Sequence, residues 1–416
     1  MKRFEKDKPR YILDSIAELA LKRHKMAFIS GPRQCGKTTV ANILKDGYDE
    51  SKYFNWDQSE FKKRWTKNPD QITQDFNLNK EKFSRLMILD EIHKSKNWKQ
   101  KIKGIFDLNS KLINIIVTGS ARLNVYRRGS DSLMGRYLLF RLHPFSLREL
   151  IEIDPATPEE CYKNLFIKKH SLADSKSKIV NTTLIDLFNY SGFPEPLMSR
   201  KKNILNIWKR GRKEKIVKED LRDLTQVKDI NLIDVLTNIL PEKIGSPLSV
   251  QSLREDLEVS HDTVSRWLAF LEELYFFFKI KPYSKSIART LKKESKIYLF
   301  DWTDILSEGA KFENLIACHL QKACNFWEDT GEGDFTLYYL RNKDKKEVDF
   351  LITKDKHPWF SVECKYKNTS LDLNYKTFQG SLNCPHIQVV YEEGIFRKID
   401  DKTWIISADY FLLQFV

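Results

Sequence analysis

Short apolar runs in the first third of the chain predict a buried parallel sheet. They cover residues 26–30, 86–89, 113–117 and 137–140. Runs of this length are typical of fully buried strands, and residues 38–44, after the first run, have helical character. We therefore expect a domain of the α/β class over residues 1–150, with a P-loop type of parallel sheet.

The middle of the chain has helical periodicity. Residues 151–240 read as a helical region, broken at 191–196. Val250, Leu253 and Leu257 follow helical spacing, and a second amphipathic helix begins after Val259-Ser260. Two helices joined by a tight turn are typical of helix-turn-helix units, so residues 241–295 are interpreted as a winged helix-turn-helix. The polar residues expected near the start of its second helix are His261, Asp262, Thr263, Ser265 and Arg266.

The last third changes to strand-like periodicity and predicts a smaller mixed α/β domain over residues 296–416. Residues 335–340, 347–352 and 360–366 read as strands, and residues 312–320 as a helix. Alternation along the third strand places Glu363 and Lys365 on one face. A hairpin would bring Asp349 beside Glu363.

A glycine-rich loop follows the first predicted strand. The sequence G-x-x-x-x-G-K-T between a strand and a helix is the pattern of a phosphate-binding loop. Its amides and the helix amino terminus can cradle phosphates, Lys37 can reach the outer phosphates, and the Thr38 hydroxyl can hold Mg²⁺. The predicted nucleotide-binding residues are Gly31, Pro32, Arg33, Gln34, Cys35, Gly36, Lys37, Thr38 and Thr39.

Polar residues at the ends of two other predicted strands complete a predicted ATP site. Asp90 and Glu91 follow residues 86–89, where Asp90 would bind Mg²⁺ and Glu91 would polarise the attacking water. Thr118 and Ser120 end the next strand, and either hydroxyl could sense the γ-phosphate. Of the arginines that follow, Arg127, Arg128 and Arg136, the last is the preferred catalytic candidate, acting in cis or from a neighbouring subunit.

The acids and lysine of the last third predict a second, metal-dependent site. An acid followed about a dozen residues later by acid-x-lysine is the signature of restriction-type nucleases. Asp349 and Glu363 are oxygen ligands suited to Mg²⁺, and Glu313 could complete the set, with Gln379 as a weaker candidate. Lys365 could orient water or neutralise developing charge. Ordinary cross-strand ion pairing would give the same pattern.

The net charge of the chain indicates what kind of partner it binds. The 416 residues include 71 Lys and Arg against 57 Asp and Glu, a net charge of +14, which favours a polyanion such as DNA. Ten basic residues lie between residues 200 and 222, as a solvated helix face or a phosphate-contacting one. The six cysteines form no C-x-x-C pair or zinc spacing, and no apolar run could span a bilayer, so we expect a cytoplasmic protein without a membrane partner.

The motifs together resemble a family of AAA-type ATPases of bacteria and archaea that carry a C-terminal domain of unknown function. The resemblance spans nearly the whole chain. The matching stretches are Gly31-Pro32-Arg33-Gln34 running into Gly36-Lys37-Thr38-Thr39, Leu89-Asp90-Glu91-Ile92-His93, Thr118-Gly119-Ser120-Ala121, Gly135-Arg136, Pro144-Phe145-Ser146-Leu147-Arg148-Glu149, Gly192-Phe193-Pro194-Glu195-Pro196, Phe312-Glu313-Asn314 and Glu347-Val348-Asp349-Phe350. The resemblance implies an ATPase domain, a helical and winged-helix middle, and a restriction-endonuclease-like C-terminal domain.

These observations support three functional hypotheses. The first is a DNA-acting ATPase, using ATP and Mg²⁺, with a metal-dependent nuclease domain. The second is a regulatory ATPase switch that binds a protein partner and carries an inactive nuclease-like scaffold. The third is an ATPase that moves DNA without cutting it. A homo-oligomer is compatible with each, since the catalytic arginine could come from a neighbouring subunit.

Overall fold

The computed structural model describes residues 10–78, 80, 83–119, 123, 133–166, 172–220, 229–284, 294–367 and 369–416. It divides into two compact units, residues 1–143 and residues 144–416. Residues 1–143 are called unit 1, and residues 144–416 are called unit 2.

Unit 1 contains a five-stranded parallel sheet with the order β2-β3-β4-β1-β5. Its strands are β1 (Met26–Ser30), β2 (Glu50–Asn55), β3 (Arg85–Asp90), β4 (Asn114–Gly119) and β5 (Tyr137–Arg141). Its helices are α1 (Leu13–Ser15), η1 (Ile16–Ala20), η2 (Leu21–Arg23), α2 (Lys37–Lys45), α3 (Ser59–Lys67), η3 (Pro69–Asp75), η4 (Ile92–Lys94) and α4 (Trp98–Asn109).

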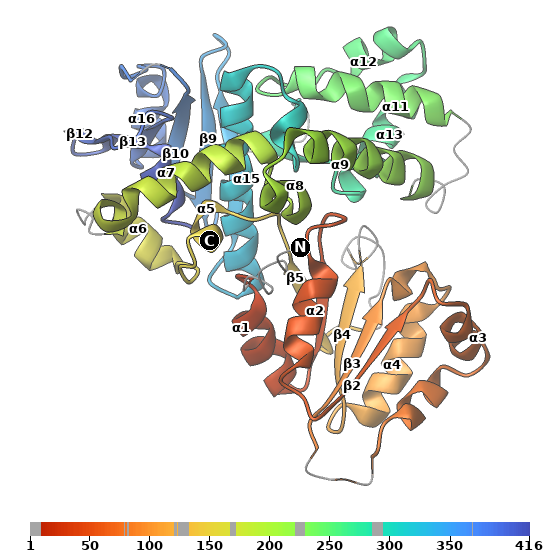
Figure 1. Ribbon diagram of the computed structural model, residues 1–416. Helices are drawn as coiled ribbons and strands as arrows, with labels where there is room; N and C mark the ends of the chain where they lie inside the picture. Colours follow the sequence, from red (N-terminus) through yellow and green to blue (C-terminus); the bar gives the residue numbers. More distant parts are fainter. Residues whose placement is uncertain are drawn as a thin grey trace. The chain divides into compact units, whose positions relative to one another are not determined.

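Helices α3 and α4 bury the apolar side chains of one sheet face. Phe61 and Trp65 of α3 and Ile102 of α4 share a core with Phe28 of β1 and Leu89 of β3. Helix α2 contacts β3 and β4 (Figure 1). Because all five strands run in parallel, their carboxyl ends meet at one edge of the sheet, which is where polar residues gather.

Unit 2 contains an eight-stranded mixed sheet with the order β12-β13-β11-β10-β9-β8-β6-β7. The strands are β6 (Phe277–Pro282), β7 (Lys296–Leu299), β8 (Phe335–Arg341), β9 (Glu347–Lys354), β10 (His357–Lys365), β11 (His386–Val390), β12 (Phe396–Asp400) and β13 (Thr403–Ser407). Strands β8, β9 and β10 form an antiparallel meander, and β11 lies parallel to β10.

The helices of unit 2 cover this sheet and extend beyond it (Figure 1). They are α5 (Leu147–Leu150), α6 (Pro158–Phe166), α7 (Leu172–Tyr190), α8 (Pro194–Ser199), α9 (Lys202–Glu214), η7 (Lys215–Asp220), α11 (Ile230–Ile239), η8 (Leu240–Lys243), α12 (Val250–Leu257), α13 (His261–Glu273), η9 (Trp302–Asp304), α15 (Glu308–Asp329), α16 (Lys376–Leu382) and α17 (Ala408–Leu412). The long helix α15 packs on β7, β8 and β10.

The two helices predicted at 250–274 are present as α12 and α13. The Ser260 hydroxyl caps α13 by accepting a hydrogen bond from the Thr263 amide at 3.1 Å. Strand β6, which follows this helix pair, pairs with both β7 and β8. The predicted domain boundary at residue 295 therefore falls between two paired strands of a single sheet.

Two motifs of the resemblance have structural roles in unit 2. Ser146 and Glu149 form a reciprocal capping box on α5, and Glu149 also accepts from the buried ammonium of Lys322. Gly192 accepts a hydrogen bond from the Phe145 amide at 2.7 Å, and a Cβ on it would lie 2.8 Å from the Phe145 carbonyl oxygen. These motif residues hold the chain segment that begins unit 2.

Candidate functional site

The loop after β1 has a backbone that only glycine permits at two positions. A Cβ on Gly31 would lie 2.2 Å from the Leu142 carbonyl oxygen. Gly36, which precedes α2, has a left-handed φ of 101°. The Cys35 thiol is fully buried against the Leu142 carbonyl, so that residue can offer a phosphate its backbone amide only.

The Lys37 ammonium folds back onto the loop. It donates to the carbonyl oxygens of Gly31 at 2.9 Å and Pro32 at 2.7 Å, and its side chain is buried. Both acceptors are neutral backbone groups, and charge-assisted hydrogen bonds to phosphate oxygens would be stronger. The loop therefore holds a buried ammonium that an anionic ligand can capture.

Asp90, at the carboxyl end of β3, is surrounded by hydroxyl groups. Its carboxylate accepts hydrogen bonds from Thr118 and Tyr53, and the Thr38 hydroxyl lies 3.4 Å from its Oδ2. The strand register explains why these groups lie close together. Thr118 of β4 pairs with Asp90 of β3 on one side and with Ile29 of β1 on the other. Thr38 and Asp90 provide hard oxygen donors, which suit Mg²⁺ bound together with substrate phosphates.

Tyr53 of β2 was not foreseen from the sequence. Burial, followed by its hydrogen bond to the Asp90 carboxylate, raises the pKa of Tyr53. The phenol therefore stays protonated and donates to Asp90. Its strand carries one buried residue among six, so the apolar pattern gave no signal for it.

Glu91 stands one residue beyond β3, with its backbone in the left-handed region at φ 56°. Its amide donates to the Thr118 carbonyl at 2.9 Å, which fixes this conformation. Burial raises the pKa of Glu91, while the charges of Lys37, Lys94 and Arg33 partly oppose the shift. A carboxylate with a raised pKa near a phosphate loop has the properties of a general base.

His93 was also missed as a neighbour of Glu91. Its Nε2 lies 3.5 Å from the Glu91 carboxylate. A Cβ on Gly119 would lie 2.5 Å from the His93 Nδ1, so the glycine of the Thr118-Gly119 pair makes room for the imidazole. The Asp90-Glu91-Ile92-His93 and Thr118-Gly119 motifs are therefore packed against each other.

Arg10, in the segment before the first strand, forms hydrogen bonds that hold the phosphate loop in place. Its buried guanidinium donates to the Cys35 carbonyl at 2.5 Å and to the His143 carbonyl at 2.6 Å. No apolar pattern or motif marks this residue. Its two acceptors join the loop to the chain that follows β5.

Arg136 does not belong to the site formed by Lys37 and Asp90, which corrects its predicted cis role. Its guanidinium forms a two-point ion pair with Asp107 of α4, at 2.6 and 3.1 Å. It precedes β5, which runs parallel to β1 with Met26 opposite Tyr137, so it lies at the amino edge of the sheet. Ser120, Arg127 and Arg128 lie outside the described residues.

Unit 2 brings together the predicted nuclease residues. Asp349 of β9 lies opposite Glu363 of β10: the Cys364 amide donates to Asp349 at 2.9 Å, and the Asp349 amide lies 3.3 Å from the Glu363 carboxylate. Lys365 contacts Glu363 at 2.8 Å and Asp372 at 2.9 Å. Gln379 lies on α16, whereas Asp349 and Glu363 lie on β9 and β10.

A lysine that the sequence reasoning did not single out stands at the centre of this acidic cluster. The Lys296 ammonium of β7 lies 3.2 Å from Glu313, 2.6 Å from Glu347 and 3.6 Å from Asp349. Its side chain is 0% exposed. Burial alone would lower the pKa of Lys296, but the three carboxylates raise it above its usual range, so the ammonium is charged.

Two of these acids also interact with other groups of the protein. The Tyr298 hydroxyl donates to Glu313 at 2.6 Å. Burial, together with the charges of Glu313 and Glu363, raises the pKa of Asp349. Among the residues that the structure describes, no group of three or more His, Cys, Asp and Glu side chains is arranged to hold a metal ion. Two of the predicted Mg²⁺ ligands, Glu313 and Asp349, therefore contact the Lys296 ammonium, and the third, Glu363, contacts Lys365.

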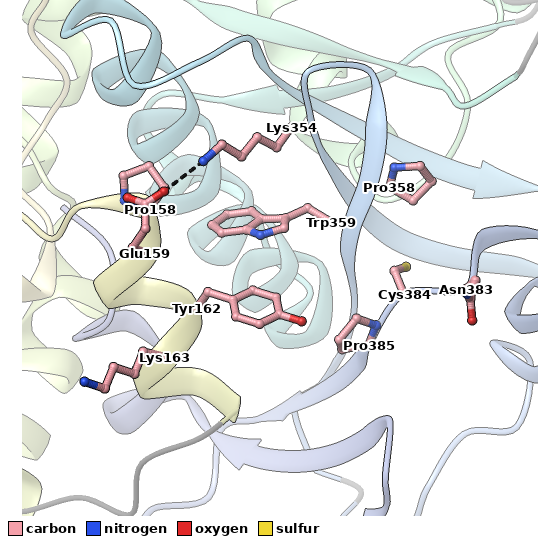
Figure 2. A pocket seen from close by; sticks show the side chains of 10 residues that line it. All are labelled: Pro158, Glu159, Tyr162, Lys163, Lys354, Pro358, Trp359, Asn383, Cys384 and Pro385. Atoms are coloured by element: carbon pink, nitrogen blue, oxygen red, sulfur yellow. Dashed lines mark hydrogen bonds and ion pairs between the residues drawn. The ribbon is translucent and has the colours of Figure 1, made fainter.

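A separate hollow of about 510 Å³ opens near the amino ends of β10 and β11. Figure 2 shows Tyr162 of α6 beside Trp359 of β10, with Lys354 paired to Glu159 above them. The two rings stack with centroids 5.8 Å apart. None of the predicted site residues lines this hollow, and half of its lining residues are aromatic or proline.

Three segments of the chain match known families. Residues 23–151 match a model described as an AAA domain. Residues 181–303 and 308–411 match two domains of unknown function, DUF8612 and DUF4143. The parallel sheet and phosphate loop described above agree with this match, so the amino-terminal part of the chain is an AAA-ATPase-like domain with an α/β fold. The other two matches assign no activity.

Similar proteins include two uncharacterized ones. One, from Methanocaldococcus jannaschii, is 25% identical over 353 residues, covering 78% of this chain and 73% of the relative. Another, from Haemophilus influenzae, is 25% identical over 393 residues, covering 88% and 87%. Both likenesses cover most of the chain, and neither relative has an assigned function.

Two solved structures give only distant likenesses. The Aeropyrum pernix ORC1 protein in complex with DNA is 16% identical with a TM-score of 0.29, covering 73% of this chain and 91% of that chain. AMPPCP-bound DnaA from Aquifex aeolicus is 17% identical with a TM-score of 0.30, covering 63% and 86%. At these TM-scores the likeness does not extend to a shared arrangement of the whole chain. Among the described residues no helix is long and apolar enough to cross a membrane.

Proposed function

We propose that this protein binds and hydrolyses MgATP in unit 1 and acts on DNA through unit 2 without cutting it. The observation that carries the proposal is the convergence of Lys37, Thr38, Asp90 and Glu91 at the carboxyl edge of one parallel sheet. This set provides phosphate capture, a magnesium position and a base.

Each of these residues has a distinct part in hydrolysis. Lys37 exchanges its contacts with two loop carbonyls for the outer phosphates of ATP. Thr38 and Asp90 would hold Mg²⁺, which would supply positive charge to neutralise the phosphates. Thr118 and Tyr53 keep the Asp90 carboxylate oriented by donating to it. Glu91 accepts a proton from the attacking water, and its raised pKa suits that task.

Action on DNA is supported by charge and by the helix pair of unit 2. The chain carries a net charge of +14. His261, Asp262 and Arg266 are exposed at the start of α13, while Val264 and Trp267 are buried. Polar residues at the start of the second helix of a helix-turn-helix are those that contact bases or phosphates. We interpret residues 241–295 as a winged helix-turn-helix, of which residues 285–293 lie outside the described residues.

The C-terminal domain is proposed to be restriction-endonuclease-like in type but silent in catalysis. The adjacency of Asp349 and Glu363 on β9 and β10 supports the type. Cleavage by such a centre needs a divalent ion to generate the nucleophile and clamp the phosphate. The Lys296 ammonium already forms ion pairs with Glu313, Glu347 and Asp349, which supports a domain that does not cleave.

The same observation favours one alternative, a regulatory ATPase switch that binds a protein partner. The two proposals differ in whether DNA changes the ATPase rate. Turnover of the purified chain should be measured with and without single-stranded, duplex and branched DNA. Stimulation by DNA is expected, with no Mg²⁺-dependent nicking of the same substrates. A rate that no DNA changes, even at low salt, would favour the regulatory switch.

The variant Glu91→Gln tests the proposed ATP hydrolysis separately from the proposed action on DNA. The amide keeps the size of the side chain but cannot accept the proton, so turnover should fall about 100-fold or more. Binding of a fluorescent ATP analogue with Mg²⁺ should remain. Loss of binding together with turnover would show that Glu91 shapes the loop rather than acting as the base.

A further inference from the structure

A second hollow of unit 2, of about 380 Å³, is lined mainly by polar and cationic side chains. Helix α9 supplies one wall, the end of α11 with η8 a second, and η9 a third. The lining residues are Asn206, Lys209, Arg210, Lys213, Thr237, Asn238, Pro241 and Asp304. The basic stretch noted at residues 200–222 therefore has a concave part.

Helical spacing explains why the cations of α9 converge. Lys209, Arg210 and Lys213 lie at positions i, i+1 and i+4, and together with Asn206 they form one stripe of the helix. Arg212 points the other way, where its guanidinium lies over the rings of Phe193 and Trp208. The cations of the hollow are thus separated from the one that anchors α9 to the core.

The protein neutralises only part of this positive charge. Lys209 forms an ion pair with Asp304 and donates to the Thr303 carbonyl at 3.1 Å. Lys213 donates to the neutral Asn238 side chain. It also interacts electrostatically with the carboxylate of Asp234. The Arg210 residue is exposed, and within the described part of the chain its guanidinium forms no ion pair or hydrogen bond. Three cations thus face one lining carboxylate.

Lys213 is partly buried and lies close to a second cation. Burial lowers the pKa of Lys213, and the neighbouring charge of Lys209 lowers it further, against the opposing influence of Asp234 and Asp304. Like charges four residues apart on a helix destabilise it. An anion in the hollow would relieve that repulsion. A guanidinium beside two ammonium groups matches the planar and point-charge contacts that phosphate oxygens accept.

We propose that the hollow between α9, α11 and η9 binds a phosphate group, and that this phosphate belongs to a DNA backbone. The assignment of the phosphate to DNA rests on the function proposed above. Helix α11 also packs against α12, so the hollow belongs to the same helical region as the proposed DNA-reading helix pair. A backbone phosphate here would add positioning contacts without sequence preference.

The test compares two double variants with equal loss of charge. Arg210→Gln with Lys213→Gln removes two cations from the hollow. Lys202→Gln with Lys215→Gln removes two exposed lysines of the same helical stretch that do not line it. DNA binding of each full-length protein is measured by fluorescence anisotropy at several salt concentrations, with the ATPase rate without DNA as a check on folding.

The hollow variant should bind DNA at least about 10-fold more weakly, and its salt dependence should drop by about two units of slope. The control variant should lose much less. Equal losses in both variants would overturn the proposal, because the contribution would then be general electrostatics. The hollow variant should melt no lower than wild type, since it relieves repulsion.

A second arm separates DNA from a free phosphate. Inorganic phosphate is added to wild type and the hollow variant, and melting is recorded. If phosphate stabilises only wild type while DNA affinity is the same in both proteins, the DNA backbone is excluded as the source. If wild type hydrolyses ATP but binds no DNA, the DNA half of the proposed function fails, and the phosphate arm alone then decides whether the hollow is an anion site.

Discussion

The two acidic sites of this protein differ in the origin of their counter-charge. In unit 1, Asp90 is contacted by neutral hydroxyl groups of Thr118 and Tyr53, and the nearby Lys37 ammonium rests on backbone carbonyls. In unit 2, the Lys296 ammonium lies among three carboxylates. The first arrangement leaves a cation for phosphate and an acid for magnesium. The second has already combined its acids with a cation, so similar residue types give a ligand site in one unit and a closed ionic core in the other.

Among the variants that test this comparison, Lys37→Ala is expected to have the largest effect on ATP turnover. The variant removes the only ammonium group that contacts the loop carbonyls in the described residues, so ATP turnover should fall about 1,000-fold or more. Because the ammonium now binds neutral carbonyls, the unfolding midpoint should change little. A large loss of stability with retained turnover would mean that Lys37 is structural, as Lys296 is.

Lys296→Met should act in the opposite way. Removing one partner of a buried ionic cluster leaves uncompensated charges, so the free energy of unfolding should fall by about 3–5 kcal/mol while ATP turnover per folded molecule is unchanged. Urea unfolding measures the loss. The matched control is Lys343→Met, on an exposed lysine.

Two further measurements sharpen that result. Adding Asp349→Asn to the Lys296 variant should restore part of the lost stability, since one of the uncompensated carboxylates is gone. Mg²⁺ should not raise the unfolding midpoint of wild type in the absence of ATP. A midpoint that Mg²⁺ raises, and that Asp349→Asn makes insensitive, would show that the cluster binds metal and that its interpretation as an ionic core is wrong.

The pH dependence of turnover gives a smaller effect. Burial raises the pKa of Glu91 above that of an ordinary glutamate. A base must be deprotonated to act, so activity should rise with pH through this pKa, and the acid limb should lie above the range of an exposed carboxyl group. The measurement is kcat against pH at saturating MgATP. An acid limb at the ordinary glutamate value would assign the base to another group.

Arg136→Ala should have the smallest effect. Its pair with Asp107 is exposed and lies at the edge of the sheet away from the phosphate loop. The rate of dilute protein should stay within about twofold of wild type, and the unfolding midpoint should hardly move. Turnover that rises with protein concentration in wild type, but not in this variant, would instead support a role from a neighbouring subunit.

Most of the fold of unit 1 could be predicted because its buried strands are continuous apolar runs. Strand β1 matches the predicted residues 26–30, and β3 and β4 differ from prediction by one or two residues at their ends. Strand β2 was missed because it is an edge strand with one buried residue among six, which leaves no apolar signature. Tyr53 lies on this strand, so its contact with Asp90 was not predicted either.

The acidic pair of unit 2 could be placed from alternation along two strands, but its neutralising cation could not. Lys296 lies more than 50 residues before Asp349 in the sequence, and it reaches the cluster because β7 and α15 pack together. Nothing in the spacing of one lysine among the many basic residues around it indicates burial.

The first glycine of the phosphate loop has a consequence for comparing related chains. Gly31 is required by the carbonyl oxygen of Leu142, which occupies the space a side chain would need. That constraint comes from the packing of the domain and would persist in a relative that no longer used a nucleotide. Lys37 is under no such packing constraint, so its replacement, rather than that of the glycine, should identify relatives that have lost hydrolysis.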